Sequence, residues 1–198
     1  MHLTVATRNR HKLRELSDLL PSIELLPLPD GVDLPPEDGD SFADNALIKA
    51  RAASSAVGAA AIADDSGIEA RALGGLPGVR SARYAGEGAG DRENLAKLLR
   101  EVAETGADRE VAYVCALAYV DDEGRERVFE ARCAGTLASE PRGQGGFGYD
   151  PAFIPSDTGS ADPRTMAELS PEEKGSISHR GRAARMLAAY LVRRRSGR

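Results

Sequence analysis

The sequence predicts an α/β fold, because β-rich segments alternate along the chain with segments whose apolar residues recur at helical spacing. At the N-terminus, residues 3–7 are β-rich and residues 12–20 carry leucines on one helical face. A second short strand is expected over residues 59–63, which form an apolar run. The chain has 198 residues, of which 41% are hydrophobic, so it can bury a sizeable core as one domain.

Turn residues and periodicity predict the other elements. Residues 27–40 are rich in proline and acidic residues, which indicates an irregular connection. Residues 42–57 predict a helix with a face of small apolar residues, and Lys49 is expected to lie off that face. The later predictions, in chain order, are a glycine-rich loop over 73–90, a helix over 91–105, antiparallel strands over 111–120 and 127–136, a short helix starting at 170–173, and a last helix capped by Ser178.

Charge and hydropathy argue against two classes of partner. The net charge of −5 disfavours broad affinity for a nucleic-acid backbone, which needs a basic face. No stretch approaches the roughly 20 apolar residues of a membrane span, and the N-terminus lacks the pattern of a signal peptide. We therefore expect a cytoplasmic protein that binds neither nucleic acid nor membrane.

The cysteines, Cys115 and Cys133, are too few for a disulfide scaffold. Each lies in an apolar, strand-like run, where a reduced and buried thiol is the usual outcome. Because the predicted hairpin would place them nearly opposite each other, a redox link between them is the alternative.

The segment Ala-Asp-Asp-Ser-Gly at residues 63–67 carries adjacent carboxylates after a short apolar run. Ligands of α/β sheets collect where strands end, and Mg²⁺ takes oxygen ligands while keeping waters and phosphates as further partners. The segment is therefore a candidate metal site for phosphate chemistry. The alternative is an acidic turn that caps the next element.

The loop over residues 7–12, Thr-Arg-Asn-Arg-His-Lys, is polar and basic, with Asn9 available as a helix cap. Such a loop presents backbone N–H groups and the positive end of a helix to an anion. It contains no glycine, which excludes a Walker-type phosphate loop.

Two further segments indicate a flat, electron-rich ligand. The glycine-rich loop over residues 143–151 contains Phe147, which could stack on a nucleobase or pack into the core. Lys174, His179 and Arg180 cluster at the entry to the last helix, where the helix dipole disfavours cations. That conflict favours a negative ligand at this position.

Taken together, these motifs resemble the inosine triphosphate pyrophosphatase family, and the resemblance runs nearly end to end. It is carried by residues 7–12, 41–51, 63–67, 74–84, 147–151 and 168–174, the last leading to 178–181. The resemblance implies one domain over residues 1–198, with a long mixed central sheet flanked by helices and two lobes around a substrate cleft. It also implies a homodimer that cleaves ITP, dITP and XTP to the monophosphate and pyrophosphate with Mg²⁺.

Roles follow from the resemblance by motif position. Asp65 would bind Mg²⁺ and accept a proton, Lys12 would act with it in catalysis, and Asp44 would be the other metal ligand. The implied substrate-binding residues are Thr7, Arg8, Asn9, Arg10, His11, Lys12, Ser66, Phe147, Gly148, Tyr149, Asp150, Lys174, His179 and Arg180.

Two positions depart from the family pattern. Arg8 stands where the family usually has glycine, so this loop is expected to be stiffer or to carry an extra charge at the mouth of the site. Asp44 stands where glutamate is usual, and its shorter side chain is expected to need a bridging water to reach the metal.

Two other functions share much of this pattern. A related pyrophosphatase with pyrimidine or modified-base preference would use the same metal and phosphate groups. A catalytically silent nucleotide sensor would bind the ligand through Asp65 and Lys12 without releasing pyrophosphate.

Overall fold

The structure is a computed structural model that describes residues 2–106, 108–159, 161 and 163–196. The chain forms two compact units. Unit 1 comprises Met1–Asp65, Cys115–Ala131 and Arg180–Arg198, and unit 2 comprises Ser66–Val114 and Arg132–His179. No helix in the described residues is long and apolar enough to cross a membrane.

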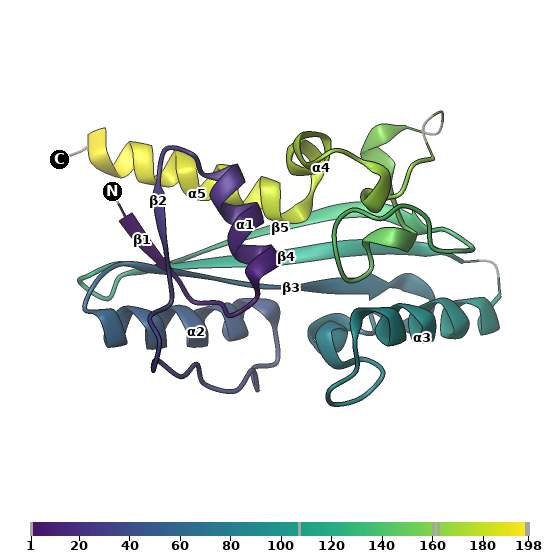
Figure 1. Ribbon diagram of the computed structural model, residues 1–198, viewed down its shortest axis with the longest axis horizontal. Coiled ribbons are helices and arrows are strands. Elements are labelled where there is room, and N and C mark those ends of the chain that lie inside the picture. Colours follow the sequence, from purple (N-terminus) through teal and green to yellow (C-terminus); the bar gives the residue numbers. More distant parts are fainter. Residues whose placement is uncertain (1, 107, 160, 162, 197–198) are drawn as a thin grey trace. The chain divides into compact units, whose positions relative to one another are not determined.

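A six-stranded sheet runs through the fold in the order β2-β1-β3-β4-β5-β6 (Figure 1). Its strands are β1 (His2–Val5), β2 (Glu24–Pro27), β3 (Ala61–Ala70), β4 (Glu110–Val120), β5 (Glu126–Leu137) and β6 (Phe153–Pro155). Strand β1 pairs in parallel with β2 and β3, whereas β5 and β6 are antiparallel. This confirms the α/β fold with a mixed sheet flanked by helices.

In unit 1, helices α1 (Arg10–Leu19) and α5 (His179–Ser196) cover one face of the sheet, and α2 (Phe42–Val57) covers the other (Figure 1). The α1 and α5 side is packed with large apolar side chains from β1, β3 and β4. The α2 side uses alanines, which allow the helix to approach the strands closely. Unit 1 therefore holds the loop that precedes α1 beside the middle of β3.

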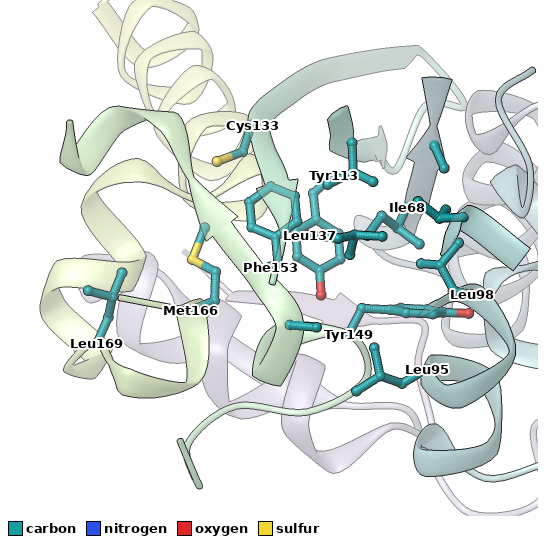
Figure 2. Packing of buried hydrophobic residues seen from close by; sticks show 14 residues of the cluster. Ile68, Leu95, Leu98, Tyr113, Cys133, Leu137, Tyr149, Phe153, Met166 and Leu169 are labelled. Carbon is teal, nitrogen blue, oxygen red and sulfur yellow. The ribbon is translucent and has the colours of Figure 1, made fainter. Parts of the chain in front are cut away.

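Unit 2 has its own hydrophobic core, shown in Figure 2. Helices α3 (Asp91–Glu104) and α4 (Pro171–Ile177) belong to this unit. The core includes Ile68, Leu98, Tyr113, Tyr149 and Phe153. Short 3₁₀ turns connect these elements: η1 (Arg71–Leu73), η2 (Gly78–Arg83), η3 (Asp150–Ala152), η4 (Ser156–Thr158) and η5 (Met166–Glu168).

The predicted end of the second strand is wrong. Strand β3 does not stop at Ala63 but continues to Ala70, so the acidic pair lies inside the strand. Charged side chains inside a buried strand are stable only when they are paired, and Lys12 and Lys49 supply those partners from two different helices. Because successive side chains of a strand alternate, Asp64 and Asp65 face opposite sides of the sheet.

Other local predictions have mixed outcomes. Both cysteines are buried thiols, which confirms the prediction that they belong to the core. Strand β2 was not predicted, because its few residues are mostly exposed and carry a weak pattern. The prediction for Lys49 is also wrong, since its side chain is buried on the inner face of α2.

Candidate active site

Asp64 is a buried carboxylate of unit 1 that is paired with two cations. Its Oδ1 lies 2.5 Å from Lys12 Nζ, and Arg180 donates from Nε to its Oδ2 at 3.1 Å. The thiol of Cys115 lies 3.0 Å from the same Oδ2. Burial alone would raise the pKa of Asp64, but Arg180 and Lys12 hold that pKa well below its usual range. Asp64 is therefore ionised and joins α1 to α5.

Asp65 faces α2 and has a different environment. Its Oδ1 lies 3.2 Å from Lys49 Nζ, which in turn lies 2.5 Å from Glu37 Oε1. Its Oδ2 is buried and has no hydrogen-bond partner within the described residues. Burial raises the pKa of Asp65, with Lys49 opposing the shift and Glu37 adding to it. This oxygen is the one buried carboxylate atom in the described chain left without a partner.

Lys12, one member of the predicted catalytic pair, approaches β3 at the peptide that links Asp64 to Asp65, the other member. Lys12 Nζ is 3.4 Å from the carbonyl oxygen of Asp64, and Lys49 Nζ is 2.9 Å from the same oxygen. The charge of Lys12 opposes part of the rise in the pKa of Asp65 that burial causes. The structure therefore brings Lys12 next to the peptide that carries Asp65.

The two predicted metal ligands, Asp65 and Asp44, have different surroundings. No group of three or more His, Cys, Asp or Glu side chains with metal-binding geometry occurs among the described residues. Asp44 is exposed, and its carboxylate accepts a hydrogen bond from Ser41 Oγ at 2.7 Å in the first turn of α2. A metal role for Asp44 stays a prediction.

The loop before α1 has the local geometry that its sequence predicts. Asn9 Oδ1 accepts hydrogen bonds from the backbone N–H groups of His11 and Lys12, at 2.9 and 3.2 Å, which confirms Asn9 as the helix cap. The backbone N–H of Asn9 donates to Thr7 Oγ1 at 3.1 Å. Arg10 and His11 are exposed at this end of the helix.

Arg8 is used differently from its neighbours in the loop. Its guanidinium donates to the backbone carbonyls of Leu28, Pro29 and Val32, at 3.0, 3.0 and 2.8 Å. Arg8 therefore links the loop over residues 7–12 to the start of the acidic connection over residues 27–40 by hydrogen bonds. This supports the expectation of a stiffer loop.

In unit 2, Asp150 organises the second glycine-rich loop. Its Oδ2 accepts from Lys174 Nζ and from the backbone N–H of Phe147, both at 2.8 Å. The ammonium of Lys174 also lies 5.2 Å from the centre of the Phe147 ring, a cation–π distance. Phe147 is half-buried, and its use in stacking on a base stays a prediction.

The residues that follow Phe147 in this loop have different surroundings. Tyr149 is buried, and its hydroxyl donates to the carbonyl of Ser81 at 2.7 Å, so its ring serves the core. The backbone N–H of Gly148 donates to Asp91 Oδ2 at 2.7 Å. Ser66 is half-buried on β3.

His179 and Arg180 are consecutive but belong to different units. His179 is buried and stacks on Tyr113 in unit 2, with ring centroids 4.5 Å apart. Arg180 is buried in unit 1, where Nη1 lies 2.5 Å from Glu15 Oε2 in addition to its contacts with Asp64. Burial would lower the pKa of Arg180, but Asp64 and Glu15 raise it, so this guanidinium stays charged.

Sequence reasoning missed several of these partners. Lys49 follows Phe42 by seven residues, which places it on the inner face of α2, and that spacing could have identified it. Glu15, Glu37, Cys115 and Tyr113 carry no comparable signal, because their partners lie far away in the sequence.

Comparison with known proteins gives consistent matches. Residues 3–190 match the family described as the Ham1 family. The chain is 50% identical to a dITP/XTP pyrophosphatase of Mycobacterium bovis over 96% of this chain and 94% of that protein. It resembles the solved structure of a HAM1 protein from Coxiella burnetii with a TM-score of 0.87 and 38% identity, covering 98% of this chain and 99% of that one. A nucleoside-triphosphatase / dITP/XTP pyrophosphatase from Mycobacterium abscessus gives a TM-score of 0.73 and 47% identity, covering 96% and 99%.

Proposed function

Since the chain belongs to the Ham1 family, we propose that it is a pyrophosphatase that hydrolyses the non-standard purine nucleotides ITP, dITP and XTP to the monophosphate and pyrophosphate. The observation that carries this proposal is the pair of adjacent aspartates on β3. Asp64 is neutralised by Lys12 and Arg180, whereas Asp65 keeps a buried oxygen without a partner in the described structure.

Asp65 is proposed to accept the proton of the attacking water. The water oxygen bonds to the α-phosphorus, the bond from that phosphorus to the bridging oxygen breaks, and pyrophosphate leaves. A proton acceptor needs an available lone pair near the reaction, and Asp65 Oδ2 has one. Lys12 and Lys174 are proposed to neutralise charge on the phosphates and on the leaving pyrophosphate.

Mg²⁺ is the proposed cofactor, with Asp65 and Asp44 as its protein ligands. The fit rests on the chemistry of Asp65, because a buried carboxylate oxygen without a hydrogen bond suits a hard cation. Mg²⁺ usually keeps several waters and binds substrate phosphates, so one or two carboxylates suffice. When bound, it would neutralise phosphate charge and make a water more acidic.

Base selectivity is proposed to depend on the 6-position of the purine. Hypoxanthine and xanthine have a keto acceptor there, whereas adenine has an amino donor. The segment around Phe147, with Lys174, His179 and Arg180, is proposed to bind the base and its border with the phosphates. A site built to hydrogen-bond the keto group can reject the amino analogue by up to roughly 10⁴-fold.

A nucleotide panel tests the proposal. The purified protein is incubated with ITP, dITP, XTP, ATP, GTP and dUTP, with and without Mg²⁺, and both pyrophosphate and orthophosphate are measured. We expect Mg²⁺-dependent pyrophosphate release that is fastest with ITP, dITP and XTP. Equal rates on all purines would refute the selectivity, dUTP preference would favour the related pyrimidine enzyme, and binding without turnover would favour a sensor.

Two further expectations accompany this function. We propose that the protein is a homodimer, which sedimentation would test, and that it acts in the cytoplasm, where the nucleotide pool is found.

A further inference from the structure

Tyr113 of β4 contacts His179 and Asp150, two of the unit 2 residues that are proposed to bind the base. Its ring is stacked on the imidazole of His179, with centroids 4.5 Å apart and planes inclined by 11°. The ring also packs against Phe153, with ring centroids 4.4 Å apart. Figure 2 shows these two side chains next to each other in the core of unit 2. Tyr113 is 6% exposed, so this position is fixed by packing.

The hydroxyl of Tyr113 is tied to the glycine-rich loop. It lies 3.2 Å from Asp150 Oδ1, while Asp150 Oδ2 accepts from Lys174 and from the Phe147 amide. The loop passes so close that a Cβ atom on Gly146 would lie 2.1 Å from Asp150 Oδ2. A small movement of Asp150 would therefore displace both Lys174 and Phe147.

One side chain thus sets the orientation of residues from three segments: the loop around Phe147, helix α4 through Asp150 and Lys174, and the start of α5 through His179. Binding sites need their contacting groups held within about 0.5 Å and 10–20° of the productive geometry. Stacking fixes the plane of the His179 ring, and the hydroxyl fixes the carboxylate that holds the loop.

We propose that Tyr113 is a positioning residue for base selectivity, which holds His179 and the Asp150 loop in the geometry that recognises the purine. This inference rests on the proposed function. Tyr113 needs no contact with the substrate for this role, because it acts through His179 and Asp150.

Tyr113→Phe and Tyr113→Leu separate the two contacts. The first variant keeps the stacked ring and loses the hydroxyl, whereas the second loses both. Tyr119→Phe is the matched control, since Tyr119 is a buried tyrosine of the same strand whose hydroxyl contacts Arg194 in unit 1. For each protein, KM and kcat with ITP, the ratio of kcat/KM for ITP over ATP, and the melting temperature are measured.

For Tyr113→Phe we expect KM for ITP to rise by about three- to tenfold with kcat nearly unchanged, and the ratio of kcat/KM for ITP over ATP to fall by a similar factor, because the hydrogen bond that holds the Asp150 carboxylate is lost. For Tyr113→Leu that ratio should fall by a further factor of about ten, because the His179 ring also loses its stacking partner. Tyr119→Phe should keep the wild-type KM and ratio.

Tyr113→Phe decides the question even if Tyr113→Leu does not fold. A Tyr113→Phe protein with wild-type KM and selectivity overturns the inference, and so does a variant whose only change is a lower melting temperature. If the wild-type protein itself does not prefer ITP over ATP, the proposed function fails. A selective wild type with an equally selective Tyr113→Phe variant overturns only the role of Tyr113.

Discussion

Asp64 in unit 1 and Asp150 in unit 2 are both buried carboxylates beside predicted substrate-binding residues, but their partners differ in charge. Asp64 is held between the cations of Lys12 and Arg180 and also contacts the thiol of Cys115. Because Arg180 also pairs with Glu15, Asp64 belongs to an ion-pair network of two cations and two carboxylates.

Asp150 has a single cationic partner, Lys174, and two neutral donors, the Tyr113 hydroxyl and the Phe147 amide. Its surroundings are therefore close to neutral and are fixed by directional hydrogen bonds. Such a group can orient a neutral, flat base better than it can attract a charged one.

The two units thus use a buried aspartate in different ways. In unit 1 Asp64 pairs with two cations, and Oδ2 of the neighbouring Asp65 has no hydrogen-bond partner within the described residues. In unit 2 the buried aspartate orders a loop.

Asp65→Asn should have the largest effect. Asparagine keeps the shape but cannot accept a proton, so kcat should fall by about 10²- to 10⁴-fold while the nucleotide still binds. Steady-state kinetics with ITP and a direct binding measurement test this. The exposed Asp18→Asn serves as the control. A nearly active Asp65→Asn enzyme would remove Asp65 from the chemistry.

Asp64→Asn should destabilise the protein more than Asp150→Asn. The first variant leaves Arg180 and Lys12 without their shared carboxylate, and breaking a buried ion pair typically costs about 3–5 kcal/mol. The second uncouples one cation and should cost about 1–3 kcal/mol. Urea unfolding of both variants compares the two free energies. Equal losses would contradict the difference in charge on which the comparison depends.

The loss of stability at low pH tests how cationic partners act on another carboxylate, Asp121, which lies outside the predicted site. Burial would raise the pKa of Asp121, but hydrogen bonds from Arg125, Arg194 and the backbone lower it to about 2. Because the folded pKa lies below the unfolded value of about 4, this stability is present above pH 4 and is lost between pH 4 and 2.

Asp121→Asn should therefore flatten the fall in unfolding free energy between pH 4 and 2. The expected size is about 1 kcal/mol, because Arg125 is half-exposed and solvent screens its charge. Urea unfolding at several pH values measures it, with the exposed Asp122→Asn as control. If the fall in unfolding free energy between pH 4 and 2 is the same in Asp121→Asn as in the wild type, the cationic partners do not lower the pKa of Asp121.

Local signals in the sequence predicted much of the fold. Helix α2 begins and ends where expected, since Ser41 caps it and its small apolar residues keep helical spacing. Helix α3 agrees to within a residue, because its buried leucines and valine also keep helical spacing. The end of β3 could not be predicted, because the charges of Asp64 and Asp65 are neutralised by lysines from helices distant in the sequence.

The candidate site was predicted by motif position, not by contacts. The resemblance named Lys12 and Asp65 but not Lys49, which reaches Asp65 from α2. It also assigned Arg180 to the substrate, whereas in the structure Asp64 and Glu15 engage its guanidinium. Which cation pairs with which carboxylate depends on the folded chain, so sequence spacing alone does not give it.

Arg8→Gly should have the smallest effect and decides between two roles for this residue. If Arg8 mainly fastens residues 28–32, its loss should cost about 1 kcal/mol and speed hydrogen exchange in that segment, since three carbonyls lose their donor. KM for ITP should then change little. Arg8→Lys should not restore the protection, because an ammonium cannot span carbonyls as a planar guanidinium does. A large rise in KM with unchanged exchange at 28–32 would instead assign Arg8 to the substrate.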